Sequence, residues 1–356
     1  MQRCKTPINL SGKTILVTGS PGFIGFHLVM RLLPQVLSGT IVSFDNMNDY
    51  YDISLKLWRL DQIENRATEL NVNHVFEKGD LSDQNQINRL FEKYDFDIVV
   101  NLAGQAGVRH SIDCPEDYLQ SNVIGFYNIL EACRNYPVKH LVFASSSSVY
   151  GMNKKIPFST SDNTDTPVSL YAASKKSNEL MAFAYSNLYG IPTTGLRFFT
   201  VYGPAGRPDM FYFTAAEKMM NGESMTVYNN GNMERDFTYI DDIVEGITRV
   251  IVRPPYTLSS QKIDENDVPY AIYNIGKGKP ENIMHFLEVL CHELTYQRLL
   301  PEDYDLQEHV IFKTMQKGDV LTTFADTDEF YEDFGFKPEL TVEEGLSRFV
   351  SWLSLM

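Results

Sequence analysis

The feature that most constrains the fold is a regular alternation, through the first half of the chain, of short apolar runs with segments of helical spacing. The runs occupy Thr14–Thr18, Thr40–Phe44, His74–Phe76, Asp97–Asn101, Lys139–Ala144 and Thr193–Arg197. Continuous apolar strands separated by helices are typical of a parallel sheet that is covered on both faces and joined by right-handed crossovers. The sequence therefore predicts an α/β fold with a doubly wound parallel sheet.

The second half of the chain has a different rhythm. After about residue 197, loops containing Gly, Pro and Asn at 203–208 and 229–231 separate shorter helical segments. We expect a smaller mixed α/β C-terminal lobe that binds substrate, and 356 residues suffice for two such units. The expected division is 1–198 and 199–356, in an arrangement where the chain can cross between the two. Residues 254–268 have the composition of a polar surface insertion.

Charge and cysteine usage exclude several classes of protein. The 31 basic and 46 acidic residues give a net charge of −15, which disfavours nucleic acid and anionic membranes as partners. No window approaches the roughly 18 consecutive apolar residues of a membrane span. The four cysteines are far apart and form no C-x-x-C pair, so no disulfide framework is expected and a cytoplasmic location fits best.

A glycine-rich turn follows the first predicted strand. Gly19, Gly22 and Gly25 give the spacing G-x-x-G-x-x-G, and a helical segment begins within it. Such a turn lets backbone N–H groups and a helix N-terminus approach a pyrophosphate, although three glycines alone also fit an ordinary tight βα turn.

Carboxylates and small residues follow the next strands. Asp45 stands at the end of the second strand, where a carboxylate accepts hydrogen bonds from ribose hydroxyls and repels a 2′-phosphate, which favours NAD over NADP. An ordinary surface aspartate is the alternative. Residues 79–81 and 101–104 fall at the ends of later strands, where open α/β sheets bind ligands, but equally suit loops.

A serine-rich segment and a Tyr-Lys pair form the chemical centre. Ser145 to Ser148 follow the fifth strand, and Tyr171 and Lys175, four residues apart, share one face of a predicted helix. A tyrosine acting as a base near neutral pH needs its pKa of about 10 lowered by roughly 3 units. A nearby ammonium and an oxidised nicotinamide would favour the phenolate, and a serine would relay the proton.

With these motifs, the chain from Thr14 to Trp352 resembles the extended short-chain dehydrogenase/reductase superfamily, and within it the nucleotide-sugar epimerases and dehydratases. The resemblance implies a Rossmann-type domain holding NAD, with Ser146, Tyr171 and Lys175 catalytic. The cofactor-binding residues that we expect are Gly19, Gly22, Phe23, Ile24, Gly25, Asp45, Asn46, Asp80, Leu81, Leu102, Ala103, Gly104, Tyr171 and Lys175.

The closer resemblance is to UDP-glucuronate 4-epimerases. It rests on the strings at 45–52, 105–109, 145–151, 197–204, 206–209 and 235–239. It implies NAD-dependent conversion of UDP-glucuronate to UDP-galacturonate through a transient 4-keto intermediate. The substrate-binding residues so implied are Arg109, Ser147, Ser148 and Thr200, the last three at the sugar carboxylate, Arg207 and Arg235 at the diphosphate, and Asp319 at the uridine ribose.

Within this superfamily, the residues at positions 147 and 148 distinguish one reaction from another. Dehydratases of this family carry Asp-Glu where Ser147 and Ser148 stand, and related UDP-glucuronate decarboxylases carry Glu at the second position. Neither carboxylate is present here, which favours epimerisation over loss of water or carbon dioxide. The same motifs also fit a 4-epimerase of a neutral UDP-sugar, such as UDP-glucose or UDP-N-acetylglucosamine, or a non-catalytic NAD-binding protein. Gln316 replaces an arginine of UDP-galactose 4-epimerases.

Some residues have competing interpretations. Arg207 and Arg235 would also suit ion pairs with surface acids in so acidic a chain. Gly104 and His110 stand where the family usually has alanine and tyrosine. Of the seven histidines, only His285 and His292 share a probable helix face, so we expect no metal site.

Two long helices are predicted, at about 116–134 and 171–189. The resemblance implies that they join a homodimer through a four-helix interface. A stripe containing Val123, Phe126, Tyr127 and Leu130 would also suit burial within one chain.

Overall fold

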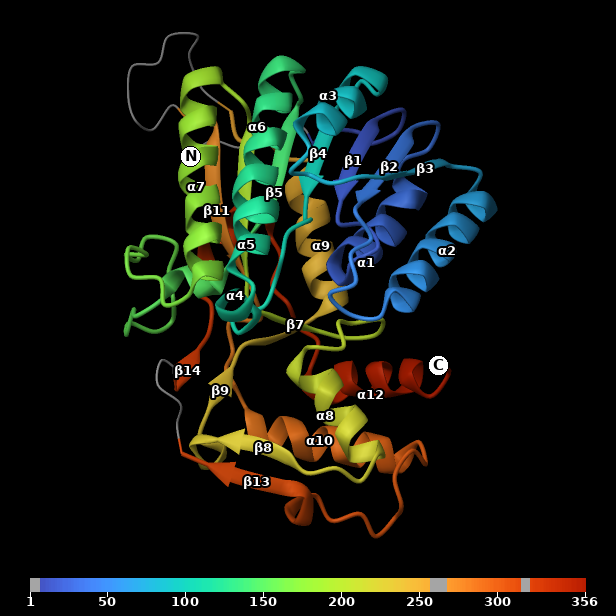
Figure 1. Ribbon diagram of the computed structural model, residues 1–356, viewed down its shortest axis with the longest axis vertical. Coiled ribbons are helices and arrows are strands. Elements are labelled where there is room, and N and C mark those ends of the chain that lie inside the picture. Colours follow the sequence, from blue (N-terminus) through green and yellow to red (C-terminus); the bar gives the residue numbers. More distant parts are fainter. Residues whose placement is uncertain (1–6, 257–267, 315–320) are drawn as a thin grey trace.

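The computed structural model describes residues 7–256, 268–314 and 321–356. Its centre is a seven-stranded parallel sheet in the order β11, β6, β5, β4, β1, β2, β3 (Figure 1). These strands are β1 (Thr14–Thr18), β2 (Thr40–Asp45), β3 (Asn73–Lys78), β4 (Ile98–Asn101), β5 (His140–Ser146), β6 (Thr193–Phe198) and β11 (Tyr270–Ile275). The predicted doubly wound sheet is confirmed.

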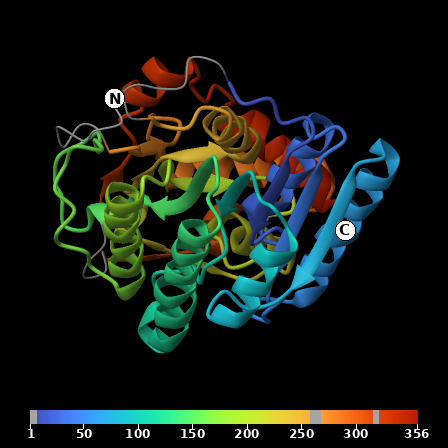
Figure 2. The same ribbon diagram turned by 90° about the horizontal axis from the view of Figure 1, so that it is seen from above.

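Helices cover both faces of this sheet (Figure 2). They are α1 (Phe23–Leu32), α2 (Ile53–Leu70), α9 (Ile240–Ile251) and α11 (Asp328–Phe334) on one face, and α3 (Gln84–Lys93), α6 (Gly125–Asn135) and α7 (Leu170–Tyr189) on the other. Ile15 and Val17 of β1 belong to the core under α1 and α9, whereas Leu16 belongs to the core under α3 and α6. Burial on both sides explains why the strands are continuously apolar.

The two predicted long helices have different outcomes. The helix expected at 171–189 is α7, which begins after Ser169, whose side chain accepts a hydrogen bond from the Ala172 N–H, and ends at left-handed Gly190. The helix expected at 116–134 is instead divided into α5 (Pro115–Tyr118), a π-helical segment η2 (Leu119–Ile124) and α6. The wider turn accompanies Asn122, whose buried side chain bonds Gln105 and Ser174.

The smaller lobe lies beyond the carboxyl ends of the strands and is mixed α/β, as predicted (Figure 1). Its helices are α8 (Phe211–Met220), α10 (Ile283–Tyr296) and α12 (Val342–Leu353). Its short strands pair as β7 (Thr200–Tyr202) with β10 (Phe237–Tyr239), β8 (Met225–Tyr228) with β13 (Val310–Lys313), and β9 (Glu234–Arg235) with β12 (Glu281–Asn282) and β14 (Thr322–Thr323).

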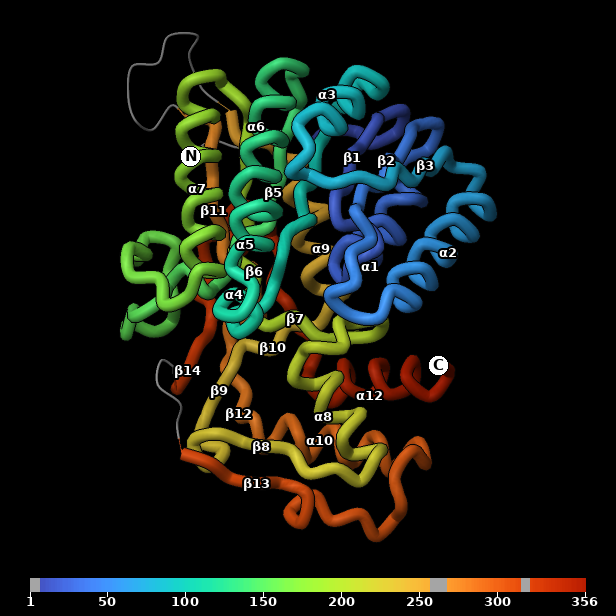
Figure 3. Tube along the Cα trace, viewed as in Figure 1, coloured from blue at the N-terminus to red at the C-terminus, as the bar shows by residue number. Residues whose placement is uncertain are grey.

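The chain crosses between the lobes more than once, as the tube in Figure 3 shows. Both α9 and β11 follow residue 199 in sequence yet pack on the large sheet. The predicted insertion at 254–268 falls largely on residues 257–267, which lie outside the described residues. Within the described ranges, no helix combines the length and apolar character that crossing a bilayer requires.

Candidate active site

A cavity of about 1090 Å³ lies where the carboxyl ends of the central strands face the smaller lobe. Its lining contains every described residue that the sequence assigned to a cofactor, a substrate or catalysis. These are Gly19, Gly22, Phe23, Ile24, Gly25, Asp45, Asn46, Asp80, Leu81, Leu102, Ala103, Gly104, Arg109, Ser146, Ser147, Ser148, Tyr171, Lys175, Thr200, Arg207 and Arg235. Asp319 and Gln316 lie outside the described residues.

The glycine turn between β1 and α1 has no room for a side chain at Gly19 or Gly25. A Cβ on Gly25 would lie 2.1 Å from the Gly19 carbonyl oxygen, and one on Gly19 would lie 2.7 Å from the Ala103 nitrogen. Gly19 also has a φ of 71°, which favours glycine. The first turn of α1 therefore presents its backbone directly to the cavity, an arrangement that suits a dinucleotide pyrophosphate.

Asp45 ends β2 at the far side of this turn. One of its carboxylate oxygens accepts a hydrogen bond of 2.7 Å from the Met47 N–H and lies 3.7 Å from the ammonium of Lys56. Burial raises the pKa of Asp45 and outweighs the opposing effect of Lys56. Asn46 bonds Asp80, so the ends of β2 and β3 are tied together. These acceptors and the bare glycine turn fit the adenosine half of NAD.

At the end of the proposed cofactor region away from Asp45, the cavity is lined by Ser146, Tyr171 and Lys175. Ser146 ends β5, and its hydroxyl oxygen accepts from both the N–H and the hydroxyl of Ser148, at 3.2 and 3.0 Å. The Tyr171 hydroxyl lies in hydrogen-bonding reach of Ser146. Lys175 is buried and donates to the Ala144 carbonyl at 3.1 Å. The predicted serine, phenol and ammonium thus all line one cavity.

Burial shifts the pKa values of Lys175 and Tyr171 in opposite directions. Burial lowers the pKa of Lys175 to about 8. Burial also raises the pKa of Tyr171, against the opposing effects of Ser146 and Arg207. The lowering expected from sequence is therefore absent in the protein alone, because desolvation of the phenolate dominates. A nearby positive charge would act in the opposite direction and favour the phenolate.

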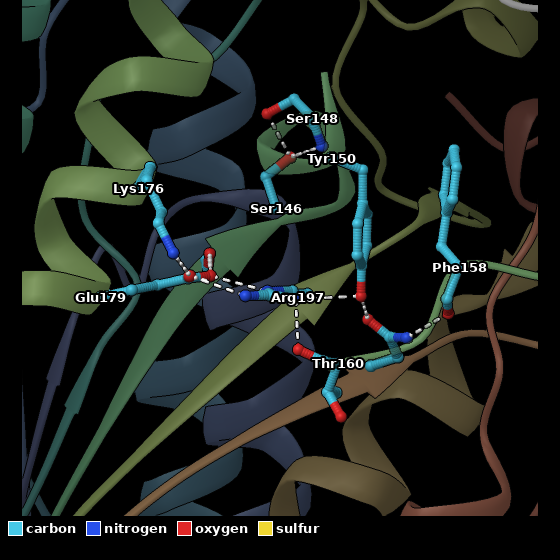
Figure 4. Close-up of polar contacts among 10 residues, drawn as sticks. Ser146, Ser148, Tyr150, Phe158, Thr160, Lys176, Glu179 and Arg197 are labelled. Atoms are coloured by element: carbon cyan, nitrogen blue, oxygen red, sulfur yellow. Dashed lines mark hydrogen bonds and ion pairs between the residues drawn. The ribbon is translucent and has the colours of Figure 1, made fainter. Parts of the chain in front are cut away.

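A buried polar network holds these elements in register (Figure 4). Glu179, one turn beyond Lys175 on α7, accepts two hydrogen bonds of 2.8 Å from Arg197 of β6. The same carboxylate accepts from the Ser145 hydroxyl at 2.6 Å. Because Ser145 precedes Ser146, this ion pair couples the helix bearing Tyr171 and Lys175 to the strand bearing the serine.

The predicted sugar-binding hydroxyls and cations enter from several elements. Ser147 and Ser148 form the first turn of the 3₁₀ segment η3 (Ser147–Tyr150), and Thr200 begins β7. Arg207 lines the cavity but also pairs with Asp209, with contacts of 3.0 and 2.5 Å. This pairing matches the alternative interpretation of Arg207 in part. Burial opposes ionisation of Asp209, but Arg207 outweighs it and lowers the pKa.

The other two arginines have partners of their own. Arg235 of β9 donates to the carbonyls of Glu234 and Leu321 at 2.8 and 3.1 Å. The Arg109 guanidinium lies 5.8 Å from the centre of the Tyr228 ring. Both side chains reach the cavity from opposite lobes.

One feature of the site escaped the sequence analysis, and a second gains an explanation from the structure. Arg59 of α2 is fully buried, and among the residues that the structure describes no carboxylate pairs with it. It donates instead to the carbonyls of Pro21, Ala205 and Gly206 and to the Tyr51 hydroxyl, at 2.7 to 3.1 Å. A polar residue on the inner face of a helix was the only signal.

The second feature concerns Gly104, where the family usually has alanine. A Cβ there would lie 2.7 Å from the Asn122 amide oxygen and 3.5 Å from the Lys175 ammonium. Glycine therefore leaves room for the Asn122 side chain beside Lys175.

Comparison with known proteins agrees with this geometry. Residues 15–276 match the NAD-dependent epimerase/dehydratase family. The chain belongs to this family. It is 45% identical over 343 residues to the protein CapI of Staphylococcus aureus, covering 95% of this chain and 97% of that one. It is 41% identical to a probable UDP-glucuronate 4-epimerase of Rhizobium meliloti, covering 95% and 96%.

A solved structure of a family member extends the comparison. The UDP-glucuronic acid 4-epimerase of Bacillus cereus, in complex with UDP-glucuronic acid and NAD, has a TM-score of 0.80 and 27% identity. The alignment covers 96% of this chain and 99% of that one. Family membership thus extends over both lobes and confirms the resemblance inferred from the motifs.

Proposed function

We propose that this protein is an NAD-dependent UDP-glucuronate 4-epimerase that interconverts UDP-glucuronate and UDP-galacturonate. One observation carries the proposal: the glycine turn, the Ser146, Tyr171 and Lys175 side chains and the hydroxyls of Ser147 and Ser148 line a single cavity. The relatives named above support the same substrate.

In this proposal Tyr171 accepts the proton of the sugar 4-hydroxyl, either directly or through the Ser146 hydroxyl. Lys175 supplies a positive charge one helical turn away and stabilises the phenolate. Bound NAD, held by the glycine turn and Asp45, would supply the acceptor for the C4 hydride and its return to the opposite face of the ketone. Tyr171 then gives its proton back to the new hydroxyl, which inverts the configuration at C4.

Hydroxyl donors suit the sugar carboxylate. The 4-keto intermediate is a β-keto acid, which loses carbon dioxide when its carboxylate turns perpendicular to the carbonyl plane or is desolvated. Two or three hydrogen bonds from Ser147, Ser148 and Thr200, at about 1.5–3 kcal/mol each to a charged group, oppose that rotation. Positions 147 and 148 also hold no carboxylate that would repel the substrate or remove a second proton.

Arg207 and Arg235 are proposed to face the diphosphate, since a bound dianion needs cationic or N–H partners. Asp209 already occupies one edge of Arg207, so the diphosphate would share or displace this partner.

The decisive experiment incubates purified protein with UDP-glucuronate without added NAD, followed by chromatography of the nucleotide sugars and measurement of carbon dioxide. UDP-galacturonate with little carbon dioxide supports both the epimerase and retained NAD. A UDP-pentose would identify a decarboxylase. If the protein leaves UDP-glucuronate unchanged but converts UDP-glucose or UDP-N-acetylglucosamine, it is a neutral-sugar epimerase.

Tyr171→Phe is the matched variant. It should lower turnover about 100- to 10,000-fold, the usual contribution of proton transfer, while NAD stays bound. Retained turnover would contradict the assignment of Tyr171, and inactivity of the wild-type protein toward every UDP-sugar would favour a binding-only role.

We further propose a cytoplasmic homodimer. Of the predicted stripe, Phe126 and Leu130 are buried within the chain and Tyr127 is exposed. Leu119 and Ile124, which lie nearby in sequence, are exposed as well. Leu180 and Phe183 of the adjoining helix α7 are exposed as well, 60% and 43%. Sedimentation at twice the mass of one chain is expected, and a monomer would contradict the dimer.

A further inference from the structure

Three side chains of different chemistry converge at the rim of the cavity, outside the proposed catalytic group. His110 lies in α4 (His110–Asp113), Cys114 lies between α4 and α5, and Asp117 lies in α5. One donor atom from each lies within 4.8 Å of the other two. The spacing between histidines does not indicate this cluster, because only one of its three residues is a histidine. The sequence pattern that corresponds to it is H-x-x-x-C-x-x-D.

The backbone turns between these residues. Cys114 leaves the helical region, with φ −126° and ψ 65°, and separates α4 from α5, while its N–H donates to the His110 carbonyl at 2.9 Å. The donor atoms of all three side chains nevertheless lie close together. The imidazole Nε2 of His110 already lies 3.4 Å from an Asp117 carboxylate oxygen.

The side chains suit a small tetrahedral cation. A zinc ion lies about 2.0–2.3 Å from its ligands, which places ligand atoms about 3.3–3.8 Å apart. The three donors therefore need to close by at most about 1.5 Å, and the partly exposed Cys114 and exposed Asp117 side chains have room for that rotation.

The donor chemistry also selects the ion. Imidazole, thiolate and carboxylate are all zinc ligands, whereas calcium and magnesium prefer oxygen ligands alone. The His110 ring is held from two sides, with its centre 4.9 Å from the Tyr50 ring and 6.0 Å from the Tyr118 ring. One of the three ligands is thus oriented before an ion arrives.

We propose that His110, Cys114 and Asp117 bind a zinc-type transition-metal ion at the rim of the cavity, with water as the fourth ligand. The proposal does not depend on the enzymatic reaction, since it concerns binding of the metal alone.

An ion here would stiffen one wall of the active site. The Tyr118 hydroxyl donates to the carbonyls of Ala106 and Gly107, at 2.8 and 2.5 Å, and its ring lies edge-on to Tyr171 at 6.1 Å. Joining α4 to α5 through the metal would fix the segment between these carbonyls and His110, which lines the cavity.

Titration of the full-length, chelator-treated protein with Co²⁺ tests the proposal, because a cobalt–thiolate bond gives an intense near-ultraviolet band. We expect one ion per chain, displacement by Zn²⁺, and loss of the band in Cys114→Ser. Asp117→Asn should weaken binding at least about tenfold, within the range seen for altered metal sites.

Asp113→Asn is the matched control, since it removes an exposed carboxylate of the same segment that is not part of the cluster. It should bind like the wild type, and circular dichroism should show all three variants folded. Absence of the thiolate band in the wild type would overturn the proposal. Binding of the Asp117→Asn variant within twofold of the wild type would do the same.

Discussion

Replacing Arg59 by leucine tests whether this buried cation joins the two ligand-binding loops. Its guanidinium bonds Pro21 in the glycine turn and Ala205 and Gly206, which directly precede Arg207. Leucine fills similar space but supplies no donor. Burial lowers the pKa of Arg59, yet an arginine stays protonated, so the native charge is retained.

The expected loss of stability follows from the orphaned acceptors. Three buried carbonyls would lose their donors at about 1–3 kcal/mol each. Removing a buried charge returns part of that cost, because its desolvation no longer opposes folding. We therefore expect the free energy of unfolding to fall by about 3–5 kcal/mol, together with weaker retention of NAD and UDP-sugar.

Urea denaturation with measurement of bound NAD per chain is the assay. Arg59→Lys should fall between the wild type and the leucine variant, because an ammonium cannot reach all the same acceptors. Arg31→Leu is the control: this arginine is exposed and pairs with Glu245 on the surface, so its removal should cost at most about 1 kcal/mol. If Arg59→Leu and Arg31→Leu lose equal stability, Arg59 does not join the loops.

Three further outcomes are expected. Glu179→Gln leaves the buried Arg197 without its carboxylate and should cost about 3 kcal/mol in urea unfolding, while an unchanged midpoint would contradict the role of the ion pair. Lys175 titrates at about 8 when folded and near 10.5 when unfolded, so the unfolded chain binds more protons between these pH values. Stability of the NAD-free protein should therefore rise across this window by up to about 1.4 kcal/mol per pH unit relative to Lys175→Met, and parallel profiles would refute the shift. Gly25→Ala places a methyl group against the Gly19 carbonyl and should lower stability by about 1–3 kcal/mol and release NAD, measured by melting temperature and bound nucleotide; normal NAD content would contradict the close approach.

The parallel sheet was predictable because burial on both faces leaves a direct mark, a continuous apolar run, at most of its strands. The seventh strand, β11 at Tyr270–Ile275, was not among the predicted runs. The π-helical turn at Leu119–Ile124 was not predictable, since it depends on where Asn122 finds partners far away in sequence. Helical periodicity alone reports a single helix there.

The candidate site, like the fold, combines residues that motifs indicate with residues that they do not. Gly19, Ser146, Tyr171 and Lys175 were proposed from motifs that require particular residues at fixed spacings, and all four line the cavity. Arg59 was missed because an arginine on a helix is ordinarily a surface residue. How far burial raises the pKa of Tyr171 was not predictable, since desolvation depends on how deeply the assembled cavity buries the phenol.

The strand β11 has a consequence for how the protein folds. It pairs with β6 through six residues, although β7, α8, β8, β9, β10 and α9 lie between the two strands in sequence. A fragment ending near residue 198 would present β6 as a bare edge, able to pair with other chains and aggregate. The large sheet is completed only after residue 275 has been synthesised. Nucleotide binding and sugar binding are therefore expected to be gained and lost in one cooperative transition.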